Sequence, residues 1–116
     1  MDDRMSPAEV AATRHLLGLS QSELCDLLGI ARSTLHDWER GKWRPSAGLQ
    51  ADLLALRAEH DAETERLADG AADGMIISLA PGPHPLGWSV ALGARVMDRV
   101  PGAMIEWTVT SALGDG

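Results

Sequence analysis

The chain has 116 residues, 45% of them hydrophobic, so it can form one compact core, or one small domain with an appended element, but not two full domains. Its single cysteine, Cys25, excludes an internal disulfide and a cysteine-based zinc site, and we expect it to be an inert packing residue. No window is apolar over the roughly 18 residues that a membrane span needs, and the first ten residues show no signal-peptide pattern. We therefore expect a cytoplasmic protein with no metal and no cofactor.

The net charge of -7 is unevenly distributed along the chain. Residues 1–45 carry six basic and seven acidic groups, residues 46–74 carry two and seven, and residues 75–116 carry two and three. Between residues 32 and 44, four cations stand against two anions, and these cations are Arg32, Arg40, Lys42 and Arg44. An acidic chain can therefore still present one cationic edge to a polyanion.

Two capping boxes predict the first two helices. Ser6-Pro7-Ala8-Glu9 combines an N-cap serine, a proline at the first helical position and a glutamate three residues after the serine, so a helix should run over about residues 7–17. Ser20-Gln21-Ser22-Glu23 repeats the box, and the helix that it starts should stop at Gly29 after barely two turns.

Two further helices follow in the pattern of apolar residues. A helix over residues 31–40 places Leu35 and Trp38 on one side, which predicts that both belong to the core. A fourth helix should start after Pro45 and end near Ala68. Its second half is strongly charged, and we expect a solvated surface there rather than a metal site. That surface includes His60, Asp61 and Glu63.

The composition changes after residue 68. Residues 69–74 are small, polar and glycine-bearing, which predicts a linker between a domain of residues 1–68 and a unit of residues 75–116. The fold class expected is mainly α, with a four-helix N-terminal domain and a small α+β C-terminal unit.

The C-terminal unit should be strand-helix-strand with a frayed tail. Apolar residues 75–79 suit a strand, residues 88–100 recur at helical spacing, and residues 104–109 alternate at strand spacing. Because a two-stranded sheet is marginal in water, we expect a homodimer in which strands of two chains share a sheet. The joint core would contain Trp88, Leu92, Val96, Ile105 and Trp107.

Residues 17–46, LGLSQSELCDLLGIARSTLHDWERGKWRPS, closely resemble the helix-turn-helix of the lambda-repressor and Cro-like family, often called XRE-type. The features that match include Ser20-Gln21, Leu28-Gly29-Ile30 and Trp38-Glu39-Arg40-Gly41-Lys42, and the resemblance covers about residues 6–67 with the flanking helices. It implies double-stranded DNA as the partner, with the second helix across the phosphate backbone and the third in the major groove.

The resemblance also implies roles for individual residues. The base-reading positions fall on Arg32, Ser33 and Asp37, with His36 beside them; Arg32 suits guanine and Asp37 suits cytosine N4. Phosphate contacts are expected from Gln21, Thr34, Arg40, Lys42 and Arg44. Arg14 and Glu39 occupy the positions of a structural ion pair that the family often carries.

Alternatives to these roles remain open. Arg32, Ser33 and His36 could be solvated helix residues, and Asp37 could be solvated as well or pair internally with Arg40. Trp43 could stack on the sugar-phosphate backbone or only cover the junction with the fourth helix.

The resulting hypothesis is a sequence-specific transcriptional regulator, a homodimeric repressor whose operator is an inverted repeat with half-sites about 34 Å apart. A looser resemblance over residues 46–100, on Leu86-Gly87-Trp88 at the start of a helix, is to anti-CRISPR-associated phage autoregulators, and implies repression of the protein's own operon. The alternative is an antitoxin whose C-terminal unit binds a toxin. An enzyme is not expected, because no Ser-His-Asp arrangement, glycine-rich phosphate loop or metal cluster is recognisable.

Overall fold

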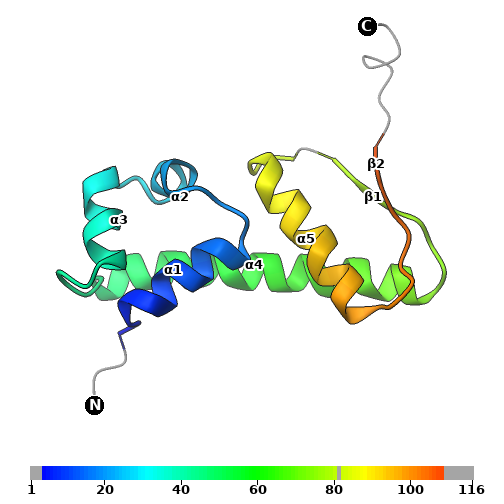
Figure 1. Ribbon diagram of the computed structural model, residues 1–116, viewed down its shortest axis with the longest axis horizontal. Coiled ribbons are helices and arrows are strands. Elements are labelled where there is room, and N and C mark those ends of the chain that lie inside the picture. Colours follow the sequence, from blue (N-terminus) through cyan, green and yellow to red (C-terminus); the bar gives the residue numbers. More distant parts are fainter. Residues whose placement is uncertain (1–3, 81, 109–116) are drawn as a thin grey trace, which may run out of the picture. The chain divides into compact units, whose positions relative to one another are not determined.

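The computed structural model describes residues 4–80 and 82–108, and within them the fold is mainly helical with a small parallel sheet (Figure 1). The elements in chain order are α1 (Pro7–Leu16), α2 (Gln21–Leu28), α3 (Arg32–Glu39), α4 (Ala47–Ala72), β1 (Ile77–Leu79), α5 (Leu86–Arg99) and β2 (Ile105–Trp107). The predicted fold class is confirmed. Contacts divide the chain into two compact units, residues 1–61 and 62–116, and this division falls within α4.

The local signals for α1 and α2 act as the sequence predicts. At α1, Glu9 N donates to Ser6 Oγ over 3.1 Å and Ser6 N donates to Glu9 Oε1 over 2.8 Å, and the box formed by Ser20 and Glu23 is built the same way. Each box satisfies two backbone N–H groups that a helix start would leave unpaired. Gly29 ends α2 in the left-handed conformation, with φ of 68°.

The core of the first unit gathers side chains from α1 to α4. Leu35 and Trp38 are both fully buried, so α3 is anchored by one side, as predicted. Trp43 meets the Trp38 ring edge-on, with centroids 5.3 Å apart. Trp43 therefore packs against α3 and is still 38% exposed, so both interpretations left open for it stay predictions. The other fully buried large side chains of this unit include Val10, Leu17, Leu24 and Leu53.

Helix α4 differs from its prediction in two respects. It continues to Ala72, so residues 69–72 of the expected linker are helical, and the chain turns only at Asp73 and Gly74. The second half was expected to be solvated, yet His60 and Thr64 are fully buried. Apolar spacing did not reveal this buried face, because the side chains buried there are polar or small rather than large and apolar. The domain boundary at residues 69–74 stays a prediction.

In the second unit, β1 and β2 pair with each other. Their register aligns Ile77 with Ile105 and Leu79 with Trp107, and the strands are parallel. Parallel neighbours require a crossover connection, which α5 provides. The two strands of this sheet thus pair within one chain, and the expectation that strands of two chains share a sheet stays a prediction. Val109 and the tail expected to fray lie outside the described residues.

The core of the second unit is built by the chain alone. Ile77, Leu79 and Val96 pack in one cluster with Ala71, and the partly buried Leu67 lies against it. Sequence reasoning missed this contribution because it ended α4 near Ala68, before the turn that carries Ala71. A strand-helix-strand unit does not need a partner to cover this face when the preceding helix supplies the missing layer.

Candidate nucleic-acid interface

The exposed side of α3 carries the residues that were predicted to read bases. Arg32, Ser33 and His36 are exposed, while Asp37 is half-buried. Gln21, at the first position of α2, lines one open hollow together with Arg32, Ser33 and His36. The fold thus brings the predicted phosphate contact on α2 and three predicted base-reading positions to one surface.

A hydrogen-bonded network holds this surface in shape. Arg14 Nε and Nη2 donate to the two carboxylate oxygens of Glu39 over 2.7 and 3.0 Å, and Arg14 Nη1 donates to the carbonyl of Leu19 over 3.0 Å. Gln21 Nε2 donates to the same carboxylate over 3.2 Å. The structure thus contains the ion pair expected between Arg14 and Glu39, and it links α1, the start of α2 and the end of α3.

The electrostatics of Glu39 follow from these contacts. Burial alone would raise its pKa, but the hydrogen bonds from Arg14 and Gln21 outweigh burial, so the pKa lies below its ordinary value. The side chains of Arg14 and Glu39 are only 12% and 9% exposed. Gln21 is therefore oriented by a carboxylate that remains ionised, and its amide retains a second N–H that can donate outward.

The cations near the end of α3 are placed differently from one another. Lys42 is exposed over 70% of its side chain, and its Nζ lies 3.9 Å from Asp37 Oδ1. Arg40 is exposed, and its Nη1 lies 3.3 Å from His36 Nε2. The internal partner of Asp37 is thus Lys42, whereas Arg40 was the alternative considered from the sequence.

Two further residues that were predicted to contact phosphates either form a hydrogen bond within the chain or are partly buried. Arg44 Nη1 donates to the carbonyl oxygen of Arg4 over 3.1 Å, which directs this guanidinium toward the N-terminal segment. Thr34 is half-buried on the first turn of α3, and its N–H donates to the carbonyl of Ala31 over 3.0 Å. Ala31 is the N-cap residue of α3, and its side chain cannot accept a hydrogen bond from the first N–H groups of the helix.

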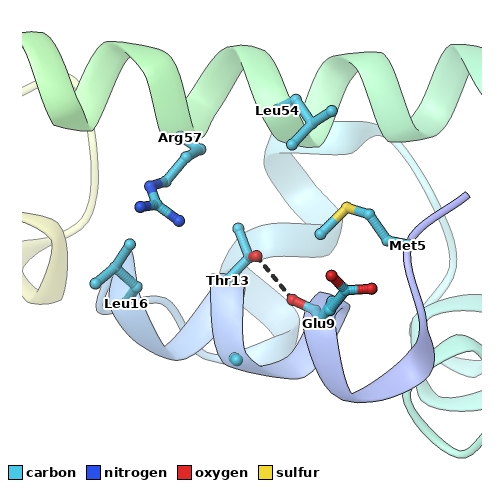
Figure 2. A pocket seen from close by; sticks show the side chains of 7 residues that line it. Met5, Glu9, Thr13, Leu16, Leu54 and Arg57 are labelled. Atoms are coloured by element: carbon cyan, nitrogen blue, oxygen red, sulfur yellow. Dashed lines mark hydrogen bonds between the residues drawn. The ribbon is translucent and has the colours of Figure 1, made fainter. Parts of the chain in front are cut away.

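A second hollow in the first unit was not anticipated from the sequence. Figure 2 shows it between α1 and the first half of α4, where Leu54 and Arg57 face α1. On α1, Thr13 Oγ1 donates to the carbonyl of Glu9 over 2.7 Å. Its lining residues are Met5, Glu9, Ala12, Thr13, Leu16, Leu54 and Arg57. None of them belongs to the hollow between α2 and α3, so the two surfaces are separate.

Cys25 is buried in the first unit, and burial raises the pKa of its thiol. The residue is therefore a packed thiol rather than a thiolate. Within residues 4–80 and 82–108, no three His, Cys, Asp or Glu side chains are grouped to hold a metal ion. In the same residues, none of the helices combines the length and apolarity that a membrane crossing requires.

The residues predicted to form a dimer core fall into two groups. Trp88, Leu92 and Val96 are 2%, 3% and 0% exposed within the chain, so they are buried without a partner, and their place in a dimer core stays a prediction. Ile105 is half-buried and Trp107 is exposed. The helical spacing identified the buried side of α5 correctly, but the chain itself covers that side.

Comparison with known proteins agrees with this geometry. A family model described as a helix-turn-helix domain matches residues 8–67, which is more than half of the chain. No curated protein matches the chain. The matched range contains α1 apart from its first residue, α2, α3, the network around Glu39 and the first part of α4. The chain therefore belongs to the helix-turn-helix domain family, and this membership indicates a DNA-binding regulator.

Proposed function

We propose that the protein is a homodimeric transcriptional repressor of the XRE type that reads an inverted repeat with α3. The observation that carries the proposal is the two-sided character of α3, whose Leu35 and Trp38 are buried while Arg32, Ser33 and His36 are exposed. A helix held in this way can enter the major groove, which is about 12 Å wide. In this proposal the protein binds DNA and catalyses no reaction.

Arg32 is the main base-reading residue in this proposal. Its guanidinium is exposed on the first turn of α3 and can form two parallel hydrogen bonds to guanine O6 and N7. Ser33 and His36 contact neighbouring base edges. Asp37 accepts from cytosine N4, and its neighbour Lys42 offsets the repulsion between the carboxylate and the phosphates.

Phosphate contacts position α3 in the groove. Gln21 is oriented by Glu39 and lies on the same surface as Arg32, so its remaining N–H suits a phosphate oxygen. Arg40 and Lys42 extend this cationic edge beyond the end of α3. Because α3 has eight residues, it is about 12 Å long and reads only a few base pairs. A long operator therefore requires a second copy and has the symmetry of the dimer.

The test is fluorescence anisotropy on a double-stranded oligonucleotide enriched from a random pool by the wild-type protein. We expect an inverted repeat. Arg32→Ala should weaken binding to it by about 5- to 150-fold while leaving binding to unselected DNA nearly unchanged. Lys42→Ala should weaken both and reduce the slope of log K against log salt by about 1.

Arg57→Ala is the matched control, because it removes the same charge from the separate hollow between α1 and α4. It should change neither the affinity nor the salt dependence. Equal weakening of selected and unselected DNA by Arg32→Ala would contradict base reading, and an enriched site without symmetry would contradict the dimer. A reporter placed behind the enriched site should lose expression when the protein is present, whereas increased expression would contradict repression.

A further inference from the structure

Helix α5 is apolar on two sides. Trp88, Leu92 and Val96 form its buried side. Leu86, Val90 and Met97 form a second apolar row at helical spacing, and these side chains are 52%, 49% and 57% exposed. No charged residue occurs from Leu86 to Ala94. A solvated helix normally carries charged or polar residues on its outer face, so this face has the composition of a contact surface.

The second apolar row borders a groove between α5 and β2. Val90, Gly93 and Met97 line it from α5, and Ile105, Glu106 and Trp107 line it from β2, with Leu79 of β1. The register aligns Trp107 with Leu79 on the same side of the parallel sheet. Leu79 is buried there, whereas Trp107 is 52% exposed. Helix α5 therefore covers this face of the sheet at Leu79 but leaves it uncovered at Trp107.

Gly93 is the point at which α5 lies against β1 beside the groove. A Cβ at this position would lie 2.8 Å from Leu79 Cδ1, so α5 and β1 approach here more closely than any larger residue permits. Val90 and Met97 flank Gly93 by three and four residues on α5, and they stand higher than the glycine. The buried Gly93 and Leu79 therefore lie at the bottom of the groove, and the exposed Val90, Met97 and Trp107 border it.

We propose that this groove is the contact surface of the homodimer, with Trp107 of each copy packed against the exposed Val90 and Met97 of the other. The inference rests on the proposed function, which requires two copies of α3. A two-fold dimer needs one surface that is complementary to itself, and the groove and Trp107 provide a hollow and a projection on the same patch. The sheets of the two copies then each gain the missing cover over β2.

The chemistry of the patch favours a second copy over a charged partner. Glu106 is the one charged residue among those that line the groove. Four side chains that are about half exposed, Leu86, Val90, Met97 and Trp107, present on the order of 400 Å² of apolar surface. That is about half of the ~800 Å² that one partner buries in a standard interface, so this patch would be the centre of the contact.

The experiment measures the mass of the full chain in solution by sedimentation equilibrium. The wild type should be a dimer at micromolar concentration. Met97→Glu and Val90→Glu place a charge on the exposed row, so each should raise the dissociation constant at least about 30-fold while circular dichroism remains that of the wild type. Trp107→Ala should act in the same direction. Leu54→Glu, an equally exposed leucine of the hollow in the first unit, is the matched control and should remain dimeric.

The outcomes separate this inference from the proposed function. A wild-type monomer would overturn both the surface and the homodimer. A wild-type dimer that Met97→Glu, Val90→Glu and Trp107→Ala leave intact would overturn this surface alone, since DNA binding by a dimer formed elsewhere would stand. Equal dissociation by Leu54→Glu would also overturn the surface. Folded, monomeric variants that still bind one half-site through Arg32 would support both.

Discussion

Arg14 of α1 and Glu39 at the end of α3 form a bidentate ion pair whose side chains are almost entirely withdrawn from solvent. Breaking such a pair from one side leaves the other charge without its partner. We expect Arg14→Met to lower the free energy of unfolding by about 3 kcal/mol, measured by urea titration followed by circular dichroism. The double variant Arg14→Met, Glu39→Leu should lose less than the sum of the single variants, because neither charge is then stranded. Additive losses would show that the two residues do not stabilise each other.

The lowered pKa of Glu39 makes this contribution dependent on pH. In the unfolded chain the carboxyl has its ordinary pKa of 4.5, and in the folded chain the hydrogen bonds from Arg14 and Gln21 hold the pKa lower. The folded state therefore binds this proton less readily, and the stabilisation is present above the ordinary pKa and is lost as the pH falls through the folded value.

Urea titrations of the wild type and of Glu39→Gln, from about pH 7 to about pH 3, test this dependence. The difference in free energy of unfolding between them should be largest near neutral pH and should shrink below the ordinary pKa of the carboxyl. A difference that stays constant with pH would mean that Glu39 stabilises the fold by packing rather than by its charge.

Cys25 should be a poorly reactive thiol in the folded protein. It is buried, and burial raises its pKa, so both the access of a reagent and the thiolate fraction are reduced. Modification by a disulfide reagent at mildly alkaline pH should be at least about 100-fold slower in the native protein than in denaturing urea. Comparable rates in both conditions would place the thiol at the surface.

Gly29 is required by the left-handed turn that ends α2. Its φ is 68°, and an added Cβ would meet no atom within 4 Å, so the cost of a side chain there is conformational rather than steric. Gly29→Ala should lower the free energy of unfolding by about 1–2 kcal/mol, as measured by urea titration.

Gly48 provides the matched control, since it lies in the first turn of α4 and an added Cβ there also meets open space. Gly48→Ala should stabilise the protein by up to about 1 kcal/mol, because alanine loses less conformational entropy in a helix. Changes of the same sign at both positions would contradict the assignment of the Gly29 effect to its backbone conformation.

The helices of the first unit could be predicted because their signals are local. Ser6 with Glu9, and Ser20 with Glu23, satisfy backbone groups within a single turn, and Gly29 stops α2 through its own φ. The sequence signals for α4 were weaker. Residues 69–72 contain a glycine and an aspartate, which favour a linker, yet α4 continues through them and packs Ala71 into the second core. In this segment, tertiary packing outweighed the low helix propensity of glycine and aspartate.

The sequence by itself determined which elements form and which side of α3 and of α5 is buried, because capping, turn chemistry and apolar spacing act over a few residues. Only the tertiary structure decided what covers those sides. Apolar spacing marked Trp88, Leu92 and Val96 as buried, but periodicity does not tell whether the cover comes from the same chain or from a partner. The fold buries them within one chain and exposes Val90, Met97 and Trp107 instead, which moves the candidate dimer surface to the opposite side of α5.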